Sequence, residues 1–346
     1  LAAVLFTASN LLTPYLLHRM IGSEEVYRAT MSYLDWRVYG FFFSFIAVMF
    51  RAFYVSTTNT KILTANSVVM VLTNVVLNYI LIFGKFGFPA LGIAGAAIAS
   101  SISEAVSVMF FVIYTWKKVD YKKYGLFRFT RVDFRMLGQI LSVSIWVMIQ
   151  HGIAFGGWFI FFIAMEHLGE RPLAITNVVR SISSFLFMFV NAFASTNSSL
   201  VSNLIGAGES DRVLPLSRRM IGLCYAFVLP IGILIAMFPS TVLRIYTDNP
   251  DLIASSIPSL WVMLSSYLFA VPGFIYFFSV SGTGNTRRAL EIDMASIFVY
   301  VLYILYVAVW LRADVAVCWT TEYVYNIMIL SSFFYLWKGN WRNKKI

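Results

Sequence analysis

The feature that most constrains this chain is a recurrence of apolar segments, each long enough to cross a bilayer. Such a crossing needs about 20 apolar residues for a hydrocarbon core of about 30 Å. The chain is 60% hydrophobic and 12% charged, whereas soluble chains carry about 25% charged residues. The sequence therefore predicts an all-α, polytopic membrane helix bundle and excludes a soluble enzyme with one anchor. Ten segments are expected, at 1–17, 32–53, 62–83, 91–115, 137–165, 172–201, 213–238, 257–280, 289–311 and 314–337.

Lys and Arg are unevenly divided between alternate breaks, which accounts for most of the net charge of +10. Cytoplasmic loops retain these residues. One set of breaks and the tail hold 17 of them and the opposite set holds 6, so the first set and the C-terminus are expected in the cytoplasm. The sequence contains no basic soluble domain that could bind nucleic acid, so nucleic acid is not expected as a partner. The larger set is Lys61, Lys117, Lys118, Lys122, Lys123, Arg128, Arg131, Arg135, Arg212, Arg218, Arg219, Arg287, Arg288, Lys338, Arg342, Lys344 and Lys345.

Residues typical of catalysis or metal binding are sparse. Cys224 and Cys318 lie far apart in apolar runs without metal or redox spacing, so we interpret them as small packed side chains. An intramembrane acyl- or glycosyltransferase would need clustered His, Asp or Glu near one membrane face. The three histidines, His18, His151 and His167, are scattered instead. We expect no enzyme activity, no metal and no cofactor.

The chain repeats itself at an offset near 225 residues, which is typical of transporters. The first four apolar segments match the last four, whereas 137–201 has no counterpart. We therefore expect two further helices before residue 1, and twelve in all, arranged as two six-helix lobes around a cleft. The matching stretches are 14–20 with 239–245, 55–61 with the one-residue-longer 280–287, and Ser103-Glu104 with Thr321-Glu322.

The repeat also predicts how the chain is divided. Residues 1–116 form an incomplete N-terminal lobe of four helices, and 137–338 form a C-terminal lobe of six. Between them lies a basic cytoplasmic loop, 117–136, and a basic cytoplasmic tail follows at 339–346.

Several motifs resemble the multidrug and toxic compound extrusion (MATE) family. They are Phe50-Arg51-Ala52-Phe53 before Asn59-Thr60-Lys61, Asn74-Val75-Val76-Leu77-Asn78, Leu91-Gly92-Ile93-Ala94-Gly95-Ala96-Ala97, and Ser198-Ser199-Leu200-Val201 with Gly206-Ala207-Gly208. The resemblance implies the third to twelfth helices of a twelve-helix fold that exports organic cations in exchange for Na⁺ or H⁺. We expect a monomer in a bacterial inner membrane. The same plan serves flippases of lipid-linked saccharides, but a strongly basic cleft would favour that alternative, and 137–201 holds only Arg171 and Arg180.

Asn74 and Asn78 match the family's cation site on its fifth helix, where the second position is usually Asp. An Asn carbonyl can ligate Na⁺ but cannot carry a proton. Together with Asn66 these residues form a polar stripe within about 120° of one helix surface. The stripe is expected either to bind a cation or to form hydrogen bonds between helices.

Ionisable groups inside a membrane cost several kcal/mol unless paired or hydrated, so each is a functional candidate. Glu104 and Glu322 are candidate coupling carboxylates, with hydrogen bonding to Ser or Thr neighbours as the structural alternative. His151 could accept a proton, or be held by one hydrogen bond. Glu291 and Asp293 follow two arginines at a helix start and are interpreted as structural.

A polar face in 172–201 and nearby aromatic residues are expected to line the substrate cleft, with helix packing as the alternative. Aromatic faces attract flat organic cations. The candidates are Trp146, Gln150, Trp158, Asn177, Arg180, Ser184 and Asn191.

Overall fold

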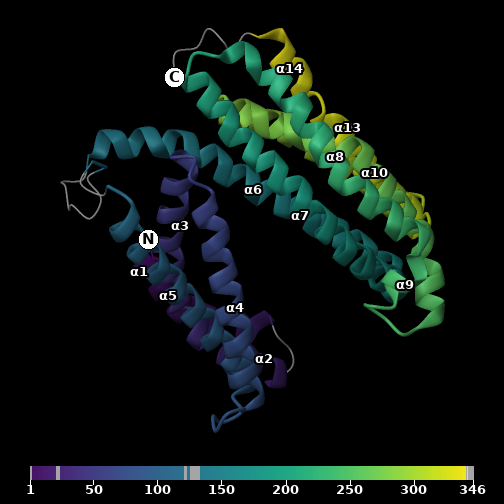
Figure 1. Ribbon diagram of the computed structural model, residues 1–346. Coiled ribbons are helices and arrows are strands. Elements are labelled where there is room, and N and C mark those ends of the chain that lie inside the picture. The colour runs from purple at the N-terminus through teal and green to yellow at the C-terminus, as the bar shows by residue number, and fades with distance from the viewer. Residues whose placement is uncertain (1, 21–23, 121–122, 125–132, 340, 342–346) are drawn as a thin grey trace. The chain divides into compact units, whose positions relative to one another are not determined.

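The computed structural model of the protein describes residues 2–20, 24–120, 123–124, 133–339 and 341. Across these ranges the regular structure is helical and no strand occurs (Figure 1). The chain forms two compact units, Leu1–Arg131 and Val132–Ile346, called here the first and second unit. Outside the described ranges lie six basic residues of the predicted loop and tail: Lys122, Arg128, Arg131, Arg342, Lys344 and Lys345.

The first unit is built around α5, which packs against α4, α3 and α2. Helices α2 and α3 meet at a bend of 51°, so that together they replace the single predicted segment 32–53. The helices are α1 (Ala2–Met20), α2 (Glu24–Arg37), α3 (Gly40–Ser56), α4 (Lys61–Phe83) and α5 (Gly92–Lys118).

The second unit has its core where α7 packs along α10, and α11 packs against α6 and α13. Cys224 and Cys318 are free and buried in this core, which confirms the expectation of small packed side chains. The elements are α6 (Phe134–Leu168), α7 (Glu170–Gly206), a 3₁₀ turn (Ser210–Arg212), α8 (Val213–Met237), α9 (Pro239–Leu243), α10 (Pro250–Gly282), α11 (Thr286–Ile304), a π turn (Leu305–Trp310), α12 (Val315–Cys318), α13 (Thr321–Ile329) and α14 (Ser332–Lys338).

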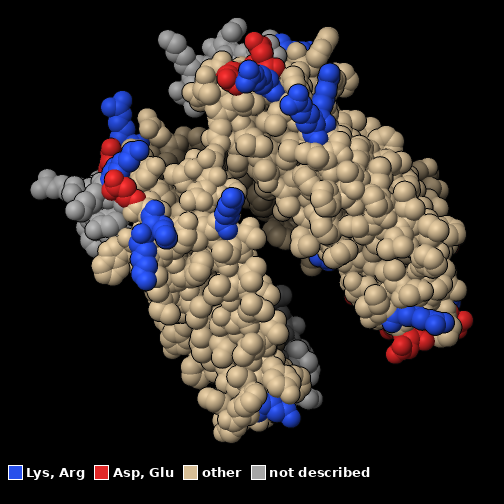
Figure 2. Space-filling model, viewed as in Figure 1, with Lys and Arg blue, Asp and Glu red and all other residues tan. Residues whose placement is uncertain are grey.

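Seven helices in the described ranges are long and apolar enough to cross a membrane, and the bent α2–α3 pair makes up to eight. The last predicted segment, 314–337, is instead divided into α12, α13 and α14. The Thr320 and Thr321 hydroxyls donate to the carbonyls of Val317 and Cys318, a local bonding that competes with a continuous helix. On the face seen in Figure 2, charged side chains gather near the ends of each unit and the long sides between them are largely uncharged.

The Leu91–Ala97 motif joins α4 to α5 by two different uses of glycine. Gly92 has a φ of +53°, a conformation that suits glycine because it has no side chain. Gly95 lies against the α4 backbone, where an added Cβ would come within 2.6 Å of the Leu81 carbonyl oxygen. The motif therefore fixes both the turn and the close approach of the two helices.

The turns after α3 and α10 have the same local geometry, in agreement with the internal repeat. Thr58 has a φ of 59° and Gly284 a φ of 77°, and an Asn follows each residue. The two turns correspond at an offset of 226 residues, and the extra residue of 280–287 belongs to α10.

Candidate functional site

In the first unit, the amides predicted to form a stripe on α4 meet serines of α5. Asn74 Nδ2 lies 3.3 Å from Ser100 Oγ and 3.5 Å from Ser103 Oγ, and Asn78 Nδ2 donates to Asn74 Oδ1 at 3.0 Å. The side-chain oxygen of Asn78 is buried and has no hydrogen-bond partner among the described residues. The pair therefore combines a structural contact to α5 with one open carbonyl oxygen, the type of ligand that a hard cation prefers.

Asn66 belongs to the same stripe and is 1% exposed. Its Nδ2 donates to Ser107 Oγ at 2.8 Å, and its Oδ1 is buried without a partner in the described part of the chain. The stripe thus offers amide oxygens along α4, each oriented by a hydrogen bond from the nitrogen of the same amide.

Glu104 on α5 forms a two-pronged ion pair with Arg37 at the end of α2. The distances are 3.0 Å from Nη1 to Oε2 and 2.7 Å from Nη2 to Oε1. Ser103, the neighbour expected to bond Glu104, donates instead to the Ser100 carbonyl. Because a guanidinium already neutralises Glu104, a coupling cation at this carboxylate would have to displace Arg37.

Glu322, the repeat counterpart of Glu104, has a different environment at the start of α13. The Tyr300 hydroxyl of α11 lies 3.5 Å from Glu322 Oε1. No ion pair to this carboxylate occurs within the described ranges. Among the described residues, Glu322 therefore has a hydroxyl neighbour where Glu104 has a guanidinium.

Asp293 on α11, interpreted from the sequence as structural, is buried in the second unit. It is 2% exposed and accepts a hydrogen bond from the Tyr325 hydroxyl of α13 at 2.9 Å. Gln150 and His151 of α6 lie within interaction range of the same carboxylate. Glu291, the other carboxylate interpreted as structural, pairs with Arg287 and Arg288, and no such pair involves Asp293 within the described ranges.

His151 itself is exposed, and its Nδ1 lies 2.8 Å from the carbonyl oxygen of Val147 one turn earlier on α6. The sequence leaves two alternatives for His151, a proton acceptor or a side chain held by one hydrogen bond. This contact is a hydrogen bond of the second kind. Gln150, its neighbour and a predicted cleft residue, lies near the buried carboxylate of Asp293.

The predicted polar face of α7 is exposed throughout: Asn177, Arg180, Ser184 and Asn191 all lie on the surface of the second unit. Polar groups within a membrane helix face protein or water rather than lipid. Arg180 lies over the rings of Trp158 and Phe162, with its guanidinium carbon 5.3 Å and 4.5 Å from their centroids. Arg287 likewise lies over Trp146, at 5.6 Å. An arginine side chain therefore already lies over one face of each of these two candidate tryptophans.

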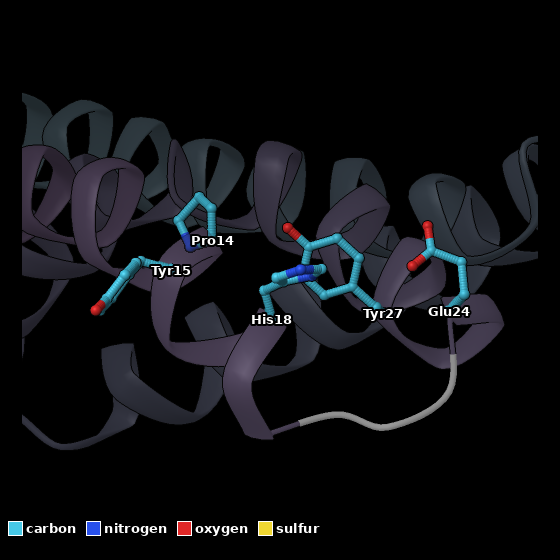
Figure 3. Close-up of a pocket in the computed structure, with 5 residues that line it drawn as sticks. All are labelled: Pro14, Tyr15, His18, Glu24 and Tyr27. Carbon is cyan, nitrogen blue, oxygen red and sulfur yellow. The ribbon is translucent and has the colours of Figure 1, made fainter.

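The hollow shown in Figure 3 lies between α1 and α2 and includes none of the predicted site residues. His18 and Tyr27 meet edge to face, with ring centroids 5.4 Å apart. Glu24, also at its edge, pairs with Arg28. Because none of the candidate residues lines this hollow, we assign it no role.

These features define a polytopic, all-helical membrane protein that carries buried polar groups inside its helix bundles, which is typical of transporters. The family model MatE matches residues 1–80 and 153–309, and the chain belongs to this family. It is a transporter family rather than an enzyme family, as the sequence predicted.

Curated relatives and solved structures agree with this assignment. The "Probable multidrug resistance protein NorM" of Thermotoga maritima is 28% identical over 239 residues, covering 68% of this chain and 50% of that protein. "Probable multidrug resistance protein YoeA" of Bacillus subtilis is 25% identical over 270 residues, covering 78% of this chain and 58% of that protein. The chain thus spans about half the length of the curated relatives it matches.

The fold resembles that of a MOP superfamily transporter from Pyrococcus furiosus, with a TM-score of 0.86, 16% identity, and coverage of 98% of this chain and 75% of that one. It also resembles the Vibrio cholerae MATE transporter VcmN in its bent form, with a TM-score of 0.82, 17% identity, and coverage of 97% and 75%. At these identities the likeness concerns the fold alone.

Proposed function

We propose that the protein is a secondary active transporter that exports small organic cations in exchange for Na⁺ or H⁺ by alternating access. The observation that carries this proposal is the match of the MatE family model to two stretches that together cover most of the chain. The names of the relatives, which refer to multidrug resistance, support the same class of activity.

The exposed polar face of α7 supports a water-accessible surface for substrate within the membrane. Arg180, the charged residue among the four, is held by cation–π contacts with the rings of Trp158 and Phe162. Arg171, the other arginine weighed for a saccharide flippase, donates to Ser255 Oγ at 2.7 Å. These two arginines are thus engaged by other side chains and do not support the basic cleft that a lipid-linked saccharide requires. We therefore prefer organic cations as the substrate class.

The coupling ion belongs to the proposal as well. The open oxygens of Asn66 and Asn78 suit Na⁺ in the first unit, whereas His151 and Glu322 suit a proton in the second. We also propose that the protein is a multi-pass bacterial inner-membrane monomer with a cytoplasmic C-terminus.

The test is efflux of a fluorescent organic cation, ethidium, from vesicles containing the purified protein, under Na⁺ and pH gradients imposed separately. One of the two gradients should accelerate efflux. Rates that respond to neither gradient would contradict antiport. Replacing Asn78 by Ala should weaken the acceleration of efflux by a Na⁺ gradient. An unchanged acceleration would indicate that the polar stripe on α4 serves helix packing.

A further inference from the structure

A groove in the second unit lies where α11 meets α13 and α14. Its volume is about 320 Å³, and it is lined by residues between 288 and 296 of α11 and between 328 and 338 of α13 and α14. None of the residues proposed for transport is among them. Binding sites are concave and few in a protein, so the groove is a candidate site of its own.

Contacts beside the groove give the relative direction of its helices. Asn285 Nδ2, at the start of α11, donates to the Tyr335 hydroxyl of α14 at 2.7 Å. The Tyr300 hydroxyl, farther along α11, lies 3.5 Å from Glu322 Oε1 at the start of α13. As the residue number rises along α11, that of the partner falls, so the helices are antiparallel. The first turn of α11 and the last turn of α14 therefore lie at the same end of the groove.

That end carries the charged residues of the groove. Arg288 of α11 and Lys338 of α14 both have exposed side chains, and Glu291 lies on the same wall as Arg288. Glu291 pairs with Arg288 and also with Arg287, whose Nε lies 3.6 Å from Glu291 Oε1. Because Arg287 can balance Glu291 on its own, the guanidinium of Arg288 and the ammonium of Lys338 are available to an anion.

Tyr335 adds a neutral donor at the same end. Its hydroxyl oxygen accepts from Asn285, and its hydrogen has no acceptor among the described residues. A hydroxyl can donate this hydrogen while its oxygen accepts. The groove thus combines an arginine, a lysine and a hydroxyl, which are the donors that bind phosphate oxygens.

Beyond the charged end the groove becomes apolar. Ile292 and Ala295 of α11 line it together with Met328 of α13. The rise of a helix places Ala295 about 10 Å beyond Arg288. A ligand that fills the whole groove must therefore combine an anionic head with an apolar part.

Exposed aromatic side chains indicate that the charged end lies at a membrane boundary. Phe334 and Trp337 of α14 are 61% and 65% exposed, and aromatic residues are enriched where hydrocarbon meets headgroups. On the face seen in Figure 2, basic side chains gather at the end of the second unit where Figure 1 labels α14. The distribution of Lys and Arg predicts that this boundary faces the cytoplasm.

We propose that this groove binds one anionic phospholipid of the leaflet predicted to be cytoplasmic. Its phosphodiester group lies between Arg288 and Lys338, and the first carbons of an acyl chain pack on Ile292, Ala295 and Met328. Basic pockets between membrane helices on this side of a membrane bind anionic headgroups. The inference concerns lipid alone and depends neither on the transported substrate nor on the coupling ion.

Thermal unfolding of the purified protein in detergent micelles tests the proposal without transport. Cys224 and Cys318 are free and fully buried, so a maleimide dye reacts with them as the protein unfolds. A ligand that binds the folded state raises the unfolding temperature. Added phosphatidylglycerol should raise it by roughly 4 °C, and phosphatidylcholine with the same acyl chains by clearly less.

Charge variants test the polar end of the groove. Arg288→Gln/Lys338→Gln should lose most of the shift that phosphatidylglycerol causes. The matched control, Arg218→Gln/Arg219→Gln, removes exposed arginines of α8 and should keep the wild-type shift. Glu291→Gln should enlarge the shift because it removes a negative charge from the groove, and a smaller shift would contradict the charge argument.

A size variant tests the apolar end. Ala295→Phe fills the groove without changing its charge and should lose the shift. Met294→Phe, at an exposed position outside the groove on the same helix, is the control and should keep it.

Inorganic phosphate, at an ionic strength matched with chloride, distinguishes a lipid from a free anion. It should cause no shift, and a shift equal to that of the lipid would mean that the site binds a small anion. An unchanged shift in both Arg288→Gln/Lys338→Gln and Ala295→Phe would overturn the groove as the site. An equal loss in Arg218→Gln/Arg219→Gln would also overturn it, since the protein would then attract anionic lipid through its charge in general.

Discussion

Thr58 carries a backbone conformation that is unfavourable for a β-branched residue. Its φ is 59°, in the left-handed region, whereas glycine occupies the corresponding position 284 of the second unit. A side chain in this region costs roughly 1–2 kcal/mol. The Thr58 hydroxyl donates a local hydrogen bond to the Thr57 carbonyl, which ties it to no other element. The first unit therefore contains strain at a turn where the second has none.

Replacing Thr58 by Gly should raise the free energy of unfolding by about 1 kcal/mol, because the steric cost disappears. Chemical unfolding of the protein in detergent micelles, followed by helical circular dichroism, measures the change. The matched control is Gly284→Thr, which should destabilise by a similar amount. A destabilised Thr58→Gly variant would mean that the threonine side chain has a stabilising role at this turn.

The Arg37–Glu104 pair makes a second prediction at this scale. Its side chains are 28% and 16% exposed, and removing one partner from a shielded pair leaves an unbalanced charge. Arg37→Gln and Glu104→Gln should each destabilise by about 2 kcal/mol, less than a fully buried pair because of this exposure. The double variant should lose less than the sum in the same unfolding assay. Arg28→Gln, which breaks an exposed pair, is the control and should have little effect.

Among the elements, the contact between α4 and α5 depends on the smallest possible side chain at position 95. A Cβ there would lie 2.6 Å from the Leu81 carbonyl oxygen, which is backbone and has little freedom to move. Gly138 on α6 is also helical, but a Cβ added there would meet no neighbour within 4 Å. Substituting each of these two glycines therefore distinguishes the effect of close packing on stability from the effect of helix propensity.

Gly95→Ala should destabilise the protein by about 2 kcal/mol because α5 must move away from α4. Gly138→Ala should be neutral or stabilising by up to about 1 kcal/mol, since alanine favours helix. Thermal unfolding of both variants checks the difference. Equal effects at the two positions would show that α4 and α5 separate without penalty.

The elements also show where sequence reasoning succeeds and where it stops. Apolar length predicted α4, α5 and α10, because a membrane crossing is a one-dimensional property of the chain. The division into α12, α13 and α14 depends on local hydroxyl bonds that hydropathy does not register. The burial of Asp293 could not be read from the sequence, because Glu291 and Asp293 were considered together, whereas two positions apart on a helix lie on nearly opposite sides, and of the two only Glu291 is exposed.

For the whole molecule, the distribution of Lys and Arg predicts an orientation that labelling can test. Cys224 and Cys318 are replaced by Ser first, which leaves a background without thiols because the chain has two cysteines. Lys117→Cys should then react with an impermeant maleimide only from the cytoplasmic side, and Lys85→Cys only from the outside. The same accessibility for both positions would contradict the predicted topology.

The bend between α2 and α3 places Gly40 directly against the Arg37–Glu104 pair. A Cβ at this position would collide with Arg37 and would lie 2.5 Å from Glu104 Oε2, so a larger residue would require the ends of both side chains to shift and would disturb their pairing. Related proteins that have lost Gly40 should therefore also have lost or relocated the arginine or the glutamate. The three positions are expected to vary together as a single evolutionary unit.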